Sequence, residues 1–169
     1  IADYDREKGT ITIIFQEVGK TTKMLGELNE GDFILDFVGP LGVPSHLDGV
    51  KKACVIGGGL GCAIAYPQAK WLHENGARVD VITGFRTAEL IFMDKMFANV
   101  ADNLYVLTDD GSNGNKGLVT NKLKELLDSG NEYDIIIAIG PLPMMKYVSL
   151  TSKPYGIKTI VSMNSLMID

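Results

Sequence analysis

This sequence has fewer positively than negatively charged residues, and it has no long apolar stretch. The chain carries 16 lysines and arginines against 21 aspartates and glutamates, which gives a net charge of -5, and it has no basic run. Nucleic-acid binding relies on clustered positive charge, so we expect no nucleic-acid partner. A helix that crosses a bilayer needs about 20 consecutive apolar residues, which no stretch supplies, so we expect no membrane insertion.

Cysteine is scarce as well, with only Cys54 and Cys62. Their spacing fits neither a metal knuckle nor a redox pair. We expect both to be buried thiols in a reducing compartment, and we therefore expect a cytoplasmic location. The chain has neither a signal peptide nor a starting methionine, since it opens with the polar IADYDREKG. We expect this N-terminus to be a cut rather than a natural beginning.

Several motifs of enzymes and metal sites are incomplete. GKT at residues 19–21 looks like the end of a phosphate-binding P-loop, but Ile14 stands where that loop needs its first glycine. DDGSNGN hints at a calcium loop, but Gly111 and Thr120 replace two ligand positions. The nucleophile elbow G-x-S-x-G is missing, which counts against a small-molecule hydrolase.

The GKTT stretch still predicts a short helix that begins at Gly19 and includes Met24 and Leu25. A helix start with free amides and the hydroxyls of Thr21 and Thr22 can bind a phosphate. An ordinary N-terminal cap is the alternative interpretation.

The 169 residues are enough for one sizeable domain, or for one domain and part of another. Residues 1–50 read as strands and turns, with strands at TITIIFQEV and DFILDFVG. GPLGVPSHLDGV, rich in glycine and proline, follows as a domain boundary.

From Lys51 onward, apolar strands alternate with helices. We expect strands at KACVIGG, RVDVITG, NLYVLTDDG, YDIIIAIG and IKTIVSMN. We expect helices at AIAYPQAKWLHENG, within TAELIFMDKMFANV, and at GLVTNKLKELLDSG and PLPMMKYVSLTS. This alternation predicts an α/β fold, a Rossmann-like parallel sheet with helices on both faces. Such sheets bind ligands at the carboxyl ends of their strands.

The strongest local signal is the run CVIGGGLGCAIAYPQAKWL, in which an apolar strand enters Gly57, Gly58, Gly59 and Gly61 and then a helix. Glycine lets the backbone approach a pyrophosphate, and the amides of the helix favour the anion. A tight strand-to-helix turn is the alternative. The loop also lacks the third glycine of the dinucleotide fingerprint at its usual place.

The other strand ends carry small or polar residues that we expect to face the same crevice. Arg86 follows the second strand and could meet an adenosine phosphate, although a surface arginine is an equal alternative. The candidate residues for this crevice are Gly58, Gly59, Gly61, Arg86, Thr108, Asp109, Gly140 and Pro141.

The order of motifs along the chain adds a family resemblance. GKTT, GPLG, GGGLG, GFRT, TDDGS, GPLPMMK and SMNSLMID span essentially the whole sequence. This set resembles the flavin- and nicotinamide-binding electron-transfer subunits of the ferredoxin–NADP reductase superfamily. Within it, the chain is similar to the dihydroorotate dehydrogenase electron-transfer subunit and to the small subunit of NADH-dependent ferredoxin–NADP oxidoreductase, also called sulfide dehydrogenase.

The resemblance implies that residues 1–50 form the C-terminal part of an FAD-binding β-barrel and that residues 51–169 form an NAD(P)-binding domain. It implies that Gly19, Thr21 and Thr22 lie against the FAD pyrophosphate. It further implies that hydride passes from NAD(P)H to FAD, and electrons then pass to a 2Fe–2S cluster and a catalytic partner subunit. That partner would be dihydroorotate dehydrogenase-like or ferredoxin/NADPH oxidoreductase-like.

Hydride transfer needs two rings held in the right geometry rather than a side-chain base, so we nominate no catalytic residue. The arginine-containing flavin segment of the family would lie before Ile1, and the cluster cysteines would lie after Asp169. Ile64 and Ile139 replace a proline and a cysteine that many relatives carry. We therefore expect the chain alone to be inactive and to bind flavin weakly or not at all.

The nucleotide preference depends on one side chain and on the resemblance. Arg86 could pair with the 2′-phosphate of NADPH, but the similar branch of the family uses NADH, and we favour NADH. A non-catalytic nucleotide-binding module remains the alternative function.

Overall fold

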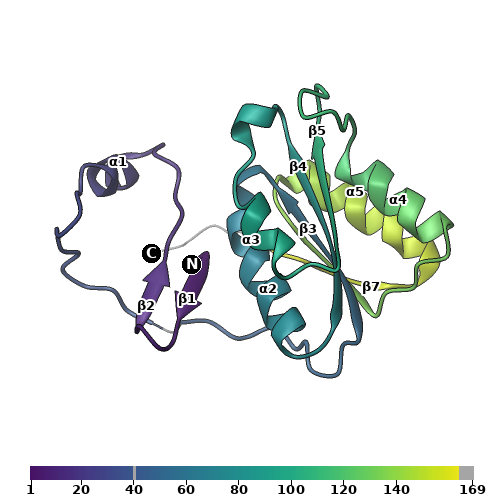
Figure 1. Cartoon of the computed structure of the whole chain (residues 1–169), viewed down its shortest axis with the longest axis horizontal. Helices are drawn as coiled ribbons and strands as arrows, with labels where there is room; N and C mark the ends of the chain where they lie inside the picture. Colours follow the sequence, from purple (N-terminus) through teal and green to yellow (C-terminus); the bar gives the residue numbers. More distant parts are fainter. Residues whose placement is uncertain (40, 164–169) are drawn as a thin grey trace.

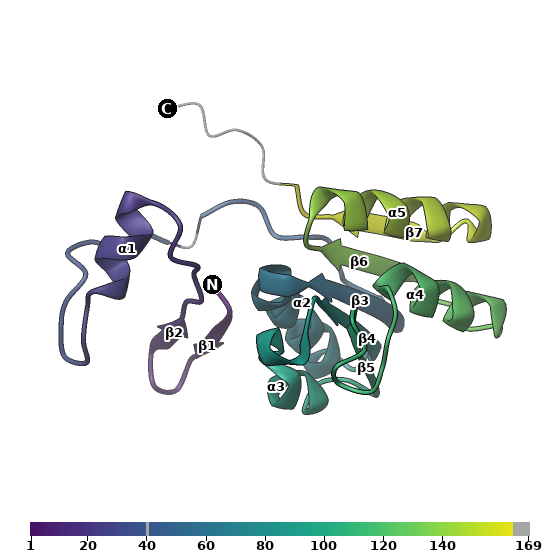
Figure 2. The ribbon, with the colours of Figure 1, turned by 90° about the horizontal axis from the view of Figure 1, so that it is seen from above.

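The computed structural model describes residues 1–39 and 41–163, and it shows a small N-terminal region beside a larger α/β domain (Figures 1 and 2). The N-terminal region contains an antiparallel hairpin, β1 (Asp3–Asp5) and β2 (Thr10–Thr12), and helix α1 (Lys20–Gly26). The hairpin is nearer to the α/β domain than α1 is in both views. Pro40 in the predicted boundary segment and residues 164–169 of the last motif lie outside the described residues.

The α/β domain is built on a parallel sheet of five strands in the order β5-β4-β3-β6-β7. The strands are β3 (Lys52–Gly58), β4 (Arg78–Phe85), β5 (Asn103–Thr108), β6 (Ile135–Ile139) and β7 (Lys158–Val161). Gly57 pairs with Ile139, Gly58 with Gly84 and Phe85 with Thr108 in the register. The carboxyl ends of β3, β4, β5 and β6 therefore meet at one edge of the sheet.

Helices cover both faces of this sheet, as Figure 2 shows. The helices are α2 (Cys62–Glu74), α3 (Asp94–Ala98), α4 (Val119–Asp128) and α5 (Leu142–Ser152), with short 3-10 turns η1 (Gly59–Gly61), η2 (Ala88–Leu90) and η3 (Lys153–Tyr155). Alternate strand residues face opposite sides, so Ala53 and Val55 pack with α2 while Cys54 and Ile56 pack with α4 and α5. The predicted α/β sheet with helices on both faces is confirmed.

The strand predictions in the N-terminal region are wrong in extent. The predicted strand from residue 10 to 18 is limited to Thr10–Thr12, and residues 32–39 form no strand. Phe33 and Leu35 are 91% and 95% exposed, so this segment has no layer to pack against within the described residues. A strand needs a neighbour to satisfy its backbone groups, and the apolar pattern alone cannot provide one. The assignment of residues 1–50 to a flavin barrel stays a prediction.

Within residues 1–39 and 41–163, no helix has the length and apolar character that crossing a bilayer requires.

A buried polar cluster joins three strand starts at the amino end of the sheet. The Asp80 side chain, in a residue 3% exposed, accepts hydrogen bonds from the Tyr133 hydroxyl and from the Asn103 amide, both at 2.7 Å. Burial, and then the hydrogen bond to Asp80, raise the pKa of Tyr133, which keeps its hydroxyl a donor. The cluster satisfies a carboxyl group that would otherwise be costly to bury.

We expect Tyr133→Phe to lower the free energy of unfolding by about 2 kcal/mol, because it leaves one buried oxygen of Asp80 without its donor. Urea unfolding followed by circular dichroism measures the change. Tyr155→Phe is the matched control, because the Tyr155 hydroxyl also donates to a carboxylate, Asp128, but both groups are exposed. An equal loss in the two variants would contradict a special role for the buried cluster.

Candidate functional site

The glycine loop between β3 and α2 leaves one face of its backbone open. Gly59 has a φ of 52°, the left-handed conformation that glycine adopts without strain. A Cβ atom placed on Gly59 would meet no other atom within 4 Å. The loop continues through the turn η1 into α2, and the Cys62 N–H donates to the Gly59 carbonyl there. The loop thus presents open backbone at Gly59 just before a helix start, a position where proteins often bind anions.

Gly61 and Gly140 hold two elements in close backbone contact. A Cβ atom on Gly61 would lie 2.7 Å from the carbonyl carbon of Ile139 and 2.8 Å from Cα of Gly140. A Cβ atom on Gly140 would lie 3.0 Å from Cα of Gly58. The structure therefore brings these three predicted glycines together between β3 and β6. This is the switch point where the strand order reverses and where open α/β sheets bind ligands.

Two residues at the start of α5 complete this side of the crevice. A Cβ atom on Gly58 would lie 3.0 Å from Cδ of Pro141 and would also collide with the Met144 sulfur. Pro141 was predicted from its strand end, and it is exposed. Met144 was not predicted, because an apolar residue in a helix carries no sign of a binding site in the sequence.

Two further glycines serve packing beside the site. A Cβ atom on Gly57 would lie 2.7 Å from Sγ of Cys62, and one on Gly84 would lie 2.6 Å from Cγ1 of Val119. The sequence signal for both was present, as glycine at the end of an apolar strand, but it did not separate packing from ligand contact.

The ends of β4 and β5 form the other side of the crevice. Arg86 and Asp109 are both exposed there, and the Asp109 N–H donates to the Phe85 carbonyl at 2.9 Å. The Ala88 N–H donates to the Ser112 hydroxyl at 2.7 Å, which ties the two loops together. The structure therefore places Arg86 and Asp109 on neighbouring loops.

Thr108 has a structural role in this region, because it holds a loop in position. It is fully buried, and its hydroxyl donates to the Asn113 side chain at 2.8 Å. The Asn113 amide in turn donates to the Val106 carbonyl at 3.0 Å. Thr108 thus fixes the loop that carries Asp109, and its hydroxyl is already engaged.

Asp110 adds a second carboxylate next to Asp109. The Ser112 hydroxyl and then the Ser112 N–H donate to it, and these hydrogen bonds hold its pKa below the usual value. The Asp110 N–H donates to the Arg86 carbonyl at 3.4 Å. Two acidic residues from β5 therefore flank the end of β4.

Helix α1 begins where the GKTT stretch predicted. The Thr22 hydroxyl accepts from the N–H groups of Val18 and Gly19 at 3.0 Å and donates to the Gly19 carbonyl at 3.1 Å. Gly19 is thus the N-terminal cap residue, and the Thr22 side chain, three residues later, bonds back to the Gly19 backbone. Helix α1 stands apart from β3 and α2 in both views (Figures 1 and 2).

Comparisons with known proteins find relatives among electron-transfer subunits. No protein-family model matches the chain. An uncharacterized protein in the adh 3′ region of Clostridium beijerinckii is 51% identical over 177 residues, covering 100% of this chain and 60% of that protein. A homolog of the dihydroorotate dehydrogenase B (NAD(+)) electron transfer subunit in Thermotoga maritima is 41% identical over 169 residues, covering 100% and 59%.

A solved structure of an NADH-dependent reduced ferredoxin–NADP oxidoreductase matches with a TM-score of 0.88 and 40% sequence identity, covering 100% of this chain and 60% of the other. The chain is a homologue of the electron-transfer subunits and has a ferredoxin reductase-like fold. The family resemblance drawn from the motif order is thereby confirmed. The chain spans about 60% of the length of these two curated relatives.

The two cysteines of this electron-transfer homologue do not fit an iron–sulfur cluster. Cys54 and Cys62 are free and buried, on opposite faces of the sheet. Burial raises the pKa of Cys62 to about 12, so its thiol stays protonated at neutral pH. A 2Fe–2S cluster is held by four thiolate ligands. Among the described residues no group of three His, Cys, Asp or Glu side chains is placed to hold a metal ion.

Proposed function

We propose that this chain binds NADH in the crevice at Gly58, Gly59, Gly61 and Gly140 and presents it to FAD within a longer electron-transfer flavoprotein of the cytoplasm. The observation that carries the proposal is the close approach of Gly61 to Gly140 beside the open face of Gly59. A crevice of this kind suits a pyrophosphate, because backbone N–H groups can reach it without intervening side chains. The homology to electron-transfer subunits supports the same function.

The residues of this chain bind and orient the nucleotide, and none of them needs to move a proton. The loop amides at Gly59 hold the pyrophosphate, Gly140 and Pro141 lie on the nicotinamide side, and Arg86 and Asp109 lie on the adenosine side. NADH loses one hydride, which carries two electrons, and becomes NAD⁺. The rate depends on how well the chain fixes the position of the nicotinamide ring.

Bound FAD would supply the acceptor for that hydride and would pass its electrons on singly. We infer that the FAD phosphate lies beside Gly19, Thr21 and Thr22 at the start of α1, where the Thr22 hydroxyl already bonds to the Gly19 backbone. These few contacts support weak flavin binding by this chain alone. A 2Fe–2S cluster and a catalytic partner subunit would complete the transfer in the longer protein, with cluster ligands from outside this chain.

The neighbourhood of Arg86 supports NADH over NADPH. The β4 strand end carries no acidic residue of its own until Glu89, but Asp109 and Asp110 flank it from β5. A carboxylate in this position accepts a hydrogen bond from the ribose 2′-hydroxyl and repels a 2′-phosphate. Arg86 then has the adenine or the pyrophosphate as its partner.

The test is titration of the full-length flavoprotein with NADH and NADPH in the absence of oxygen, followed by flavin absorbance. We expect NADH to bleach the flavin band at lower concentrations than NADPH does.

Calorimetry of Arg86→Ala should show weaker binding of both nucleotides. Selective loss of NADPH binding, from a parent that preferred NADPH, would reverse the assignment. Nucleotide binding in a protein without flavin would instead favour the non-catalytic binding module.

A further inference from the structure

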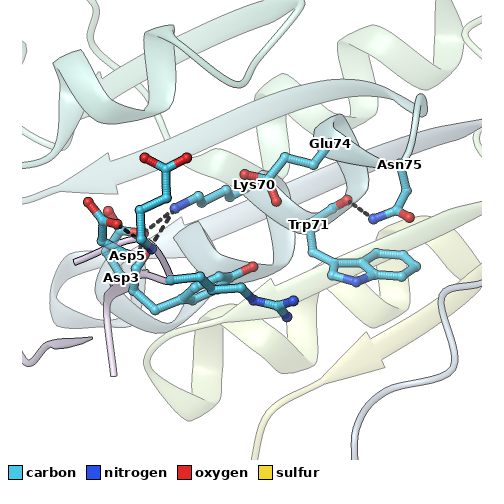
Figure 3. Close-up of a pocket in the computed structure, with 9 residues that line it drawn as sticks. Asp3, Asp5, Lys70, Trp71, Glu74 and Asn75 are labelled. Carbon is cyan, nitrogen blue, oxygen red and sulfur yellow. Dashed lines mark hydrogen bonds and ion pairs between the residues drawn. The ribbon is translucent and has the colours of Figure 1, made fainter. Parts of the chain in front are cut away.

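Strand β1, the turn that follows it and the end of α2 line an open polar cleft of about 650 Å³ (Figure 3). Its lining comes from residues 3–7 of the hairpin and from Lys70, Trp71, Glu74 and Asn75 of α2. The glycine loop precedes the other end of α2, so this cleft is distinct from the nucleotide crevice. The cleft is where the N-terminal region meets the nucleotide domain.

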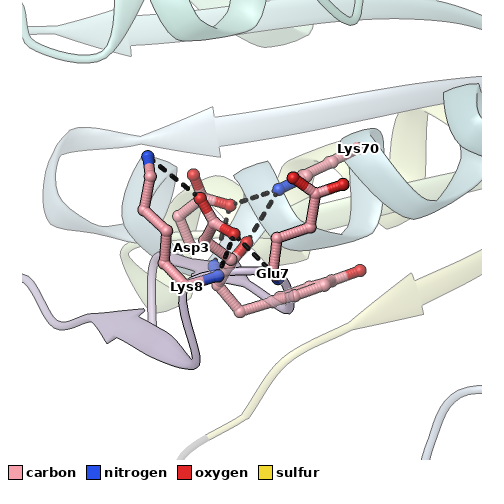
Figure 4. A network of polar contacts seen from close by, with 6 residues as sticks. Asp3, Glu7, Lys8 and Lys70 are labelled. Carbon is pink, nitrogen blue, oxygen red and sulfur yellow. Dashed lines mark hydrogen bonds and ion pairs between the residues drawn. The ribbon is translucent and has the colours of Figure 1, made fainter.

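Lys70 makes the polar contacts between these two parts. Its Nζ atom donates to the Asp3 carboxylate at 2.7 Å and to the Tyr4 carbonyl at 3.1 Å (Figure 4). The same atom lies 4.6 Å from the centre of the Tyr4 ring, a cation–π contact. The Lys70 and Asp3 side chains are only 18% and 25% exposed. The pKa of Lys70 is raised, chiefly because the Asp3 carboxylate accepts its proton in a hydrogen bond.

Apolar packing contributes little to this junction. In residues 1–39 and 41–46, Ala2 is the single buried residue. The other ion pair of the hairpin, Lys8 with Asp5 at 3.2 Å, is exposed and stays within the hairpin. Without a shared apolar core, the orientation of the hairpin on α2 depends on the few directional contacts of Lys70.

We propose that Lys70 is a positioning residue that fixes the N-terminal region on the nucleotide domain through Asp3 and Tyr4. The functional part of this inference rests on the proposed function, in which the N-terminal region belongs to the flavin side of the protein. Lys70 then sets the distance between the flavin and the nicotinamide ring. An error of about 1 Å in such a distance can cost about 100-fold in rate.

The first experiment uses the 169-residue chain and its single tryptophan, Trp71, which lies in the cleft with Tyr4. We expect Lys70→Gln to make Trp71 more accessible to quenching by acrylamide. The charge exchange Asp3→Lys with Lys70→Asp should restore protection. Lys8→Gln, which removes a charge from the same hairpin without a contact to α2, should leave quenching unchanged. Quenching of Lys70→Gln equal to that of the unmodified chain would overturn the proposal.

The second experiment measures flavin reduction by NADH in the full-length flavoprotein by stopped flow. We expect Lys70→Gln to slow the reduction by about tenfold or more while the Kd for NADH is unchanged, and the charge exchange to recover the rate. More quenching without a slower reduction would refute the positioning role. If the unmodified protein is not reduced by NADH, the proposed function fails, and the quenching experiment still decides the contact. Asp3→Asn removes the same ion pair if Lys70→Gln does not fold.

Discussion

Gly61→Ala is expected to lower the free energy of unfolding by about 3 kcal/mol. Gly61 has a φ of -58° and a ψ of -21°, a helical conformation in which alanine is normally more stable than glycine. The glycine is therefore needed for space rather than for its backbone conformation. The added methyl group would collide with the backbone of Ile139 and Gly140, which cannot move without displacing β6.

Chemical denaturation of Gly61→Ala and Gly84→Ala compares the stability lost when a methyl group collides with backbone atoms and when it collides with a side chain. A methyl group on Gly84 would meet only the end of the Val119 side chain. We expect a smaller loss for Gly84→Ala, because one side chain can shift by a few tenths of an ångström. A Gly61→Ala variant as stable as the unmodified chain would mean that α2 and β6 are not in close contact.

Gly59→Val should weaken NADH binding by at least about tenfold, or roughly 1.4 kcal/mol, while the domain stays folded. The side chain at this position points into the open space beside the loop amides. It would therefore stand between the backbone and the pyrophosphate. Isothermal titration calorimetry with NADH measures the loss.

Gly130→Val is the matched control for the strain of this substitution. Gly130 has a φ of 84° and also has no atom within 4 Å of its Cβ position, but it follows α4, away from the crevice. Both variants should lose about 1 to 2 kcal/mol of stability, because a branched side chain is strained in the left-handed conformation. Only Gly59→Val should lose NADH affinity. Unchanged affinity in Gly59→Val would make the loop a turn without a binding role.

Prediction from sequence succeeded where the signal is local. The strand 52–58 is apolar and buried after its first residue, Lys52, because helices cover both of its faces, and such an apolar run can be recognised in the sequence. The helix start at Gly19 is also local, because the Thr22 hydroxyl reaches its own backbone. The segment 32–39 failed for the opposite reason, since its apolar side chains indicate a strand but pairing needs partners outside the segment.

The candidate site also combines features that the sequence located with contacts that only the fold shows. The sequence located the glycine loop and the strand ends, but it did not separate glycines that serve packing from glycines beside open space. The roles of individual residues were not. Thr108 was predicted beside a ligand, but the fold buries its hydroxyl against Asn113, and nothing local in the sequence marks that contact.

The sequence by itself determined the order of strands and helices from Lys51 onward, the position of the glycine loop and the family to which the motifs point, because each depends on residues close together in the chain. Only the tertiary structure decided that Gly61 touches β6, that Asp109 and Asp110 flank Arg86, and that Lys70 reaches Asp3. Those contacts join residues that are 23 to 79 positions apart in the chain. Parallel strands need long crossover connections, so neighbours in the sheet are distant in the sequence. Their geometry follows from packing a whole layer of helices on the sheet, which no short stretch of sequence encodes.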